Sequence, residues 1–111
     1  MKIAIIGSRT ITITDFSSYL PSEISEIVSG GAREIDQAAR DYALSHHIKL
    51  TEFLPNYTRY GRAAPIRRNT EIIDYADEVL AFWNGSSKGT KNVIDTCRKR
   101  NKKITVHLIA K

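Results

Sequence analysis

The chain has 111 residues, of which 41% are hydrophobic and 26% charged, and its formal net charge is +5. This length fits one domain over residues 1–111, and this composition is typical of a globular protein and excludes a disordered one. No apolar run approaches the roughly 18 residues that cross a membrane, so the sequence excludes a transmembrane protein and predicts no membrane partner.

The N-terminal segment predicts a buried strand followed by a short helix. Lys2–Ile6 is a continuous apolar stretch, typical of a strand that is covered on both faces of a parallel sheet. Thr14 or Asp15 can cap a helix that ends before Pro21. That helix would carry the apolar side chains Phe16, Tyr19 and Leu20.

The next segment gives the clearest helical period in the sequence. A second strand is predicted at Glu26–Ser29 and a third at Ile48–Leu54, with a helix between them from about Ala32 to His46. Apolar side chains recur along this helix at the spacing of one helical face, at Ile35, Ala38, Ala39, Tyr42 and Ala43.

The second half of the chain continues the alternation of helices and strands. A long loop over 56–63 precedes a helix that runs from Pro65 to about Tyr75. A fourth strand is predicted at Glu78–Trp83, then a helix at Thr90–Asn101 and a fifth strand at Lys103–Ile109.

This alternation predicts a doubly wound, Rossmann-like α/β fold. We expect a five-stranded, mainly parallel sheet in the order 3-2-1-4-5, flanked by helices. Ligands of such sheets bind at the carboxyl ends of the strands, beside the point where the strand order reverses. The loops that reach this edge start at Gly7, Ser29, Pro55 and Trp83.

Two of these loops contain glycines at the start of a helix. Ser29-Gly30-Gly31-Ala32 and Gly85-Ser86-Ser87-Lys88-Gly89-Thr90 can both present backbone N–H groups to an anion such as phosphate. The alternative is that the first is a tight turn requiring positive φ and that Thr90 caps the following helix. The second loop is not a Walker A motif, because Lys88 is followed by glycine.

The loop after the first strand is Gly7-Ser8-Arg9. It lacks the G-x-G-x-x-G pattern, so a conventional NAD site is not expected, and no cofactor is predicted. Arg9 can clamp a phosphate or pair with Asp36 as a structural ion pair. Between residues 57 and 62, tyrosines alternate with arginines, a pattern that can bind bases and phosphates or form an ordinary exposed loop.

The charge distribution favours an anionic partner. Residues 1–56 carry 5 basic and 7 acidic side chains, whereas residues 57–111 carry 12 and 5. Either a phosphorylated small molecule or a nucleic acid would suit this basic half. The most basic run, residues 98–103, lies at a helix C-terminus, where cations complement the helix dipole, and at the opposite edge from the four loops.

Metal and nucleophile chemistry are not expected. His46, His47 and His107 have no metal-ligand spacing, and the single cysteine, Cys97, shares the apolar face of a helix and is interpreted as a core residue. With one cysteine, no internal disulfide can form, and we expect a cytoplasmic protein.

Several short pieces along nearly the whole chain together carry a family resemblance. In order, they are Ile5-Ile6-Gly7-Ser8-Arg9, Ser29-Gly30-Gly31-Ala32-Arg33 with Ile35-Asp36, Arg68-Asn69, Ala76-Asp77, Phe82-Trp83 and Ser87-x-Gly89-Thr90. With them the sequence resembles the SLOG superfamily, which includes the LOG phosphoribohydrolases and the DNA-processing protein DprA, and more narrowly its small single-domain YspA/YpsA-like branch. The resemblance implies binding of a nucleotide or nucleotide-derived ligand at the strand ends.

One departure bears on catalysis. LOG enzymes carry a Pro-Gly-Gly-x-Gly-Thr-x-x-Glu motif whose glutamate serves N-glycosidic cleavage, and alignment on Gly89-Thr90 places Val93 at the glutamate position. Asp36, Glu71 or Asp95 could substitute, so the catalytic residues are unknown and enzymatic activity is left open.

We therefore expect a domain that binds or senses a nucleotide-derived phosphorylated ligand. A LOG-like N-glycosidic hydrolase and a DprA-like single-strand binder are the alternatives, and homo-oligomerisation is left open. The glycines and Thr90 would contact phosphate, the arginines would balance its charge, Asp36 would orient Arg9 or a ribose hydroxyl, and Trp83 would stack on a base. The expected ligand-binding residues are Gly7, Ser8, Arg9, Gly30, Gly31, Ala32, Arg33, Asp36, Arg68, Asn69, Trp83, Ser87, Gly89 and Thr90.

Overall fold

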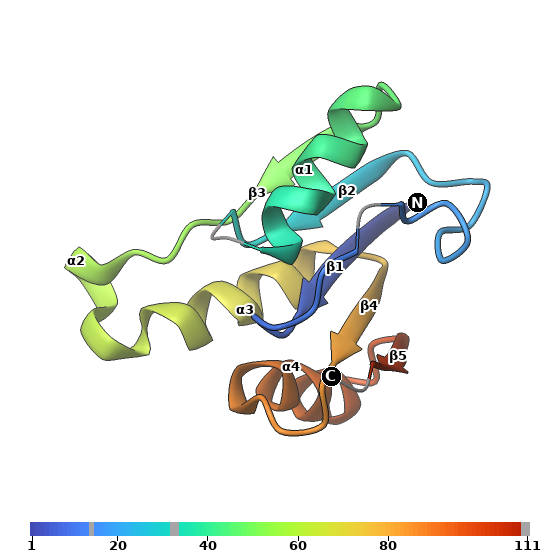
Figure 1. Ribbon diagram of the computed structural model, residues 1–111. Helices are drawn as coiled ribbons and strands as arrows, with labels where there is room; N and C mark the ends of the chain where they lie inside the picture. Colours follow the sequence, from blue (N-terminus) through green and yellow to red (C-terminus); the bar gives the residue numbers. More distant parts are fainter. Residues whose placement is uncertain (14, 32–33, 110–111) are drawn as a thin grey trace.

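The computed structural model describes residues 1–13, 15–31 and 34–109 and builds them around one parallel sheet (Figure 1). The strand order is β3-β2-β1-β4-β5, and every neighbouring pair is parallel, as the sequence predicts. The strands of the described chain are β1 (Lys2–Gly7), β2 (Glu26–Ser29), β3 (Lys49–Glu52), β4 (Glu78–Trp83) and β5 (Ile104–Leu108).

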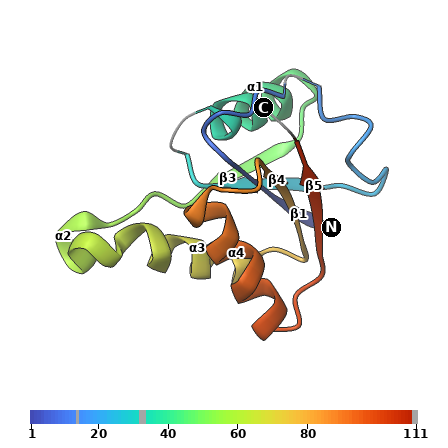
Figure 2. The same cartoon turned by 60° about the horizontal axis from the view of Figure 1, so that its bottom comes forward.

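Helices cover both faces of this sheet (Figures 1 and 2). One face packs against α1 (Ile35–Ser45), and the other packs against α3 (Ala64–Tyr75) and α4 (Lys88–Lys99). Within the described residues, no helix is long and apolar enough to cross a membrane.

The apolar run of β1 serves both layers of the core. Ile3 and Ile5 join the cluster on the α1 side, while Ala4 and Ile6 join the cluster that contains α3 and α4. Successive strand residues point to opposite faces, so a strand covered on both sides needs an apolar residue at every position. Cys97 is fully buried in the second cluster, and burial raises the pKa of its thiol to about 11. It is a core residue, as the sequence predicts.

The predicted helix before Pro21 does not form. The described residues there make a single turn, in which the Phe16 carbonyl accepts hydrogen bonds from the backbone N–H groups of Tyr19 at 2.9 Å and Leu20 at 3.1 Å. The Asp15 carboxylate bonds the N–H of Ser17 at 2.9 Å and so holds the turn, a local bond that competes with helix formation. Thr14, the other predicted cap, lies outside the described residues.

The predicted loop over 56–63 is helical instead. It forms the short helix α2 (Tyr57–Tyr60) and the 3-10 turn η1 (Gly61–Ala63), which lead directly into α3. The Asn56 side chain caps α2 by accepting a hydrogen bond from the N–H of Arg59 at 3.0 Å. Neither element buries a residue, so the segment has no apolar period from which its helical turns could be predicted.

A buried carboxylate ties β2 to its neighbours at the amino-terminal edge of the sheet. Glu26 is 6% exposed and accepts hydrogen bonds from the hydroxyls of Thr51 at 2.6 Å and Tyr75 at 2.5 Å, with the Lys49 ammonium 3.6 Å away. Desolvation raises the pKa of Glu26, but these hydrogen bonds and the Lys49 charge outweigh it and leave the pKa lowered.

Because the pKa of Glu26 is lower in the folded state, its contribution to stability is present above the ordinary pKa of a glutamate and is lost as pH falls through the lowered folded value. We expect Glu26→Gln to destabilise the fold by about 1–2 kcal/mol at pH 7 and by less at pH 3. Urea unfolding of both proteins at pH 7, 5 and 3 measures this difference. A difference that stays constant down to pH 3 would contradict the prediction.

Candidate functional site

A cavity of about 510 Å³ opens at the carboxyl ends of the strands, where the strand order reverses between β1 and β4. This is the edge that the sequence predicts, and the volume is in the range of small-molecule sites. The predicted residues that line it are Gly7, Arg9, Gly30, Asp36, Arg68, Asn69, Ser87, Gly89 and Thr90. Ser8, Gly31 and Trp83 are not among its lining residues, and Ala32 and Arg33 lie outside the described residues.

Gly7 allows α1 to approach the end of β1. A Cβ on Gly7 would lie 2.6 Å from Cδ1 of Ile35, the first residue of α1, so a side chain here would push the helix away. Gly7 therefore shapes the cavity by close packing.

Ser8 joins the turns that follow β1 and β4. It is buried, its N–H donates to the Phe82 carbonyl at 3.0 Å, and its Oγ accepts from the N–H of Asn84 at 3.2 Å. The Ser8 hydroxyl also lies 3.3 Å from that of Thr90. Ser8 thus acts behind the cavity wall and fixes the residues that line it.

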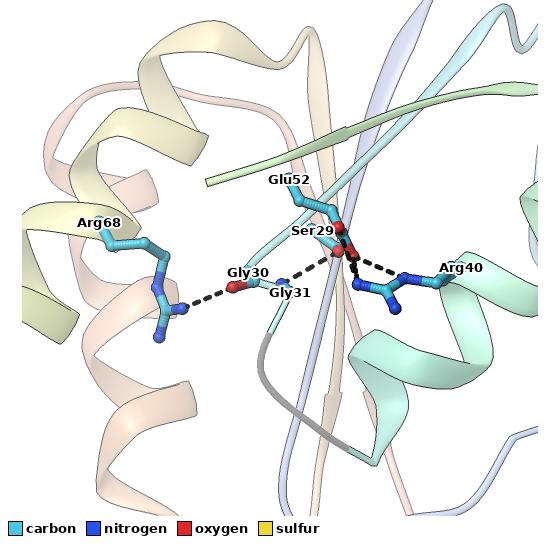
Figure 3. A network of polar contacts seen from close by, with 6 residues as sticks. All are labelled: Ser29, Gly30, Gly31, Arg40, Glu52 and Arg68. Atoms are coloured by element: carbon cyan, nitrogen blue, oxygen red, sulfur yellow. Dashed lines mark hydrogen bonds and ion pairs between the residues drawn. The ribbon is translucent and has the colours of Figure 1, made fainter. Parts of the chain in front are cut away.

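The Gly30-Gly31 turn holds an arginine in place (Figure 3). The Gly30 carbonyl accepts a hydrogen bond from Nη1 of Arg68 at 3.0 Å, and a Cβ on Gly30 would lie 2.6 Å from that same nitrogen. Gly31 adopts φ +65°, and its N–H donates to the Ser29 hydroxyl at 3.3 Å. The Gly31 N–H is therefore already occupied, and the turn serves chiefly to seat Arg68 at the cavity.

Arg68 is held at two of its nitrogens. In addition to the Nη1 bond, Nε donates to the side-chain oxygen of Asn69 at 2.9 Å. Nη2 makes no hydrogen bond to any other described residue. A guanidinium fixed in this way presents its remaining donors in a planar geometry that suits phosphate or carboxylate.

The loop between β4 and α4 is ordered by its own side chains. The Asn84 side-chain oxygen accepts from the N–H groups of Ser86 at 2.9 Å and Ser87 at 2.8 Å, and the Ser87 hydroxyl caps α4 by accepting from the N–H of Thr90 at 3.4 Å. Trp83 donates its indole N–H to the Ser87 carbonyl at 3.1 Å, so its polar edge supports this loop.

The first turn of α4 offers backbone donors to the cavity. The N–H of Lys91 reaches the Ser87 carbonyl at 3.1 Å and Thr90 is capped, which leaves the N–H groups of Lys88 and Gly89 without an acceptor in the described chain. A Cβ on Gly89 would have nothing within 4 Å, so the space beside it is open. Such a helix start favours an anion.

Charges of both signs line the cavity. Arg9 and Arg68 are the cations of its described lining, and Glu34 and Asp36 are the carboxylates. The Arg9–Asp36 pair that the sequence offered as an alternative is not among the ion pairs between described residues. The Asp36 Oδ2 lies beside Gly30, 3.3 Å from the position of a Cβ there. A ligand with both anionic groups and hydroxyl donors would match this lining.

Sequence reasoning missed several lining residues. Glu34 lies just before α1 with φ 51°, and Tyr57 opens α2 with 61% of its surface exposed. Tyr57 belongs to the segment of alternating tyrosines and arginines that could bind bases and phosphates, but it is not among the expected ligand-binding residues, and no pattern singles out Glu34. The other missed residues are Ile6, Thr10, Pro55, Pro65, Ile72, Asn84 and Val93.

The other candidate residues lie elsewhere. Val93, at the LOG glutamate position, is a buried wall residue of the cavity. Asp95 is not a lining residue and pairs with Lys91 at 2.9 Å, and Glu71 does not line the cavity either. Among the carboxylates considered from the sequence, only Asp36 lies at this site.

The basic run over 98–103 is partly neutralised and distant from the cavity. Arg98 and Lys99 form the last turn of α4, whose first turn lines the cavity. Arg100 pairs with Asp74 at 2.5 Å, and Lys103 pairs with Glu78 at 3.1 Å. In the described chain, no group of three or more His, Cys, Asp or Glu side chains is placed to hold a metal ion.

The fold and cavity define a doubly wound α/β protein with a candidate ligand site at the reversal of its strand order. Comparisons of the chain with protein-family models, with curated proteins and with solved structures found no match.

Proposed function

We propose that the protein binds or senses a nucleotide or a nucleotide-derived phosphorylated ligand in this cavity. The observation that carries the proposal is the composition of the lining, which combines donors suited to phosphate with carboxylates suited to sugar hydroxyls. A nucleotide carries both of these groups on one molecule.

The phosphate would bind on the cationic side of the cavity. The free N–H group of Gly89, the Nη2 of Arg68 and the guanidinium of Arg9 are the donors available to it. The ribose hydroxyls would donate to Asp36 or Glu34. The exposed ring of Tyr57 is a stacking surface for the base, in the role that the sequence suggested for Trp83.

The ordered set of short motifs supports this proposal independently. Membership of the SLOG superfamily would imply a nucleotide-derived ligand at the strand ends, and most of the motif residues in the described chain line or support this cavity.

Thermal unfolding with added ligands tests the proposal. The panel contains nucleoside 5′-monophosphates, the same nucleosides without phosphate, ribose 5-phosphate and inorganic phosphate. A ligand at 100 times its Kd stabilises by about 2.7 kcal/mol and should raise the midpoint by on the order of 10 °C. We expect at least one monophosphate to do so and its nucleoside to do much less. Equal stabilisation by the nucleoside, or none by any compound, would refute the proposal.

A nucleotide N-glycosidic hydrolase is the second candidate, because Glu34 and Asp36 both line the cavity. In this reaction water would add to the sugar C1′ and the base would leave with a proton, with one carboxylate activating the water. Chromatography would then detect free base and ribose 5-phosphate with the wild type, and Asp36→Asn or Glu34→Gln would abolish their formation. No free base from any monophosphate of the panel would exclude this candidate and leave the binding function standing.

A further inference from the structure

The segment over 56–67 stands apart from the rest of the molecule, and we call it the arginine arm. It comprises the Asn56 cap, α2, η1 and the first turn of α3, and it projects from the sheet on the side away from β5 (Figures 1 and 2). Since α2 and η1 bury no residue, packing of the core does not account for the side chains that this segment carries.

The arm concentrates unpaired positive charge. Residues 53–70 contain Arg59, Arg62, Arg67 and Arg68 and no aspartate or glutamate. The arginines of the arm are exposed, and none forms an ion pair with a described residue. The described cations that do form ion pairs, such as Arg40, all lie outside the arm.

Two of these arginines contact the ring of Tyr60. The guanidinium groups of Arg59 and Arg67 lie 5.2 Å and 5.3 Å from the centre of its ring, within the range of cation–π contacts. Two arginines held around one ring repel each other, and a bound anion would relieve that repulsion.

The arm continues the rim of the cavity. Tyr57, in its first turn, and Pro65, near its end, both line the cavity, and Arg68 follows immediately after. A ligand that extends out of the cavity past Tyr57 therefore meets the arm. The cavity and the arm form one continuous surface of donors and aromatic rings.

We propose that the arginine arm binds a second phosphate group of a nucleotide ligand that extends beyond the cavity. The ligand class is a nucleotide joined to at least one further nucleotide by a phosphodiester, either a free dinucleotide or the end of a strand. This inference rests on the proposed function, since the first nucleotide occupies the cavity described above.

Isothermal titration at two salt concentrations tests the proposal that the arm binds a second phosphate. The probes are the 5′-phosphorylated mono-, di- and tetranucleotides of adenine and of uracil. We expect the dinucleotide of one series to bind at least tenfold more tightly than its mononucleotide, with a stronger dependence on salt. If the tetranucleotide binds more tightly than the dinucleotide, the ligand is the end of a strand. If the two bind with equal affinity, the ligand is a free dinucleotide.

Matched double variants assign the gain to the arm. Arg59→Gln/Arg67→Gln should bring the dinucleotide to within about twofold of the mononucleotide and leave mononucleotide affinity unchanged. Arg98→Gln/Lys99→Gln removes two exposed cations at the far end of α4 and should behave as wild type. All the substituted residues are exposed, so the unfolding midpoints should agree with that of the wild type.

Two outcomes would overturn the inference, and they are distinguishable. If the mononucleotide binds and the second nucleotide adds nothing, or if the arm variant loses affinity for both probes equally, the arm has no such role and the proposed function stands. If no probe of either series binds, the proposed function fails and the inference fails with it.

Discussion

Replacing Arg68 with methionine should weaken nucleotide binding by about 100-fold, which corresponds to about 2.7 kcal/mol. Arg68 is the cation of the cavity that the fold holds in place, through the Gly30 carbonyl and the Asn69 side chain. Its orientation is therefore set before the ligand arrives, and the phosphate gains a charge-assisted hydrogen bond without the cost of ordering a flexible side chain. Titration of the monophosphate that stabilises the wild type most strongly measures the change.

Two further variants separate the charge of Arg68 from its position. Arg68→Lys keeps the charge but loses the planar donor set, and we expect about a tenfold loss of affinity. Gly30→Ala keeps Arg68 but puts a Cβ 2.6 Å from Nη1, so the guanidinium must move and affinity should fall by a similar factor. Arg98→Met, at the far end of α4, is the control for general charge. Affinity of Arg68→Met within twofold of the wild type would remove Arg68 from the site.

Replacing Phe16 with alanine should destabilise the fold by about 3–4 kcal/mol. Phe16 is fully buried, although it belongs to a single turn outside any helix or strand. Its ring makes edge contacts with Tyr42 of α1 at 5.7 Å and Phe82 of β4 at 5.8 Å between centroids. It therefore anchors the connection between β1 and β2 to the core, and its removal leaves a cavity that this turn cannot fill. Chemical denaturation followed by circular dichroism measures the loss.

Two other substitutions in the same segment show how much of the lost stability comes from the Phe16 ring. Phe16→Leu keeps most of the apolar volume and should cost about 1–2 kcal/mol, while Ser18→Ala, at an exposed position, should change stability by less than about 0.5 kcal/mol. If Phe16→Ala costs under about 1 kcal/mol, the segment is held by contacts other than the Phe16 ring.

Local patterns in the sequence sufficed to predict the sheet and its order. The unbroken apolar run of β1 requires cover on both faces, and the helical spacing in α1 supplies cover for one of them. Right-handed crossovers between parallel strands leave few arrangements for such a chain. The edge that holds the cavity followed from that order, because parallel strands all end on the same side.

The turn at Phe16 and the helical turns of α2 and η1 were predicted wrongly for opposite reasons. Three apolar residues before Pro21 resemble a helical face, but their burial is satisfied by contacts with α1 and β4, which lie far away in sequence. Neither α2 nor η1 buries a residue, so their helical turns carry no apolar face. An apolar period arises where one face of a helix packs against the rest of the protein. It therefore cannot predict a helical turn that buries no residue.

The sequence by itself determined the strand order, the edge of the sheet that carries the cavity and half of the described residues that line it, because all of these depend on local periods and on where strands end. Only the tertiary structure decided what those residues do there. It placed Tyr57 and Glu34 at the cavity, used Trp83 to support a loop, and turned the Gly30-Gly31 pair into a seat for Arg68. These roles depend on which side chains distant in sequence come within a few ångströms of one another, and the spacing of residues along a chain does not contain that information.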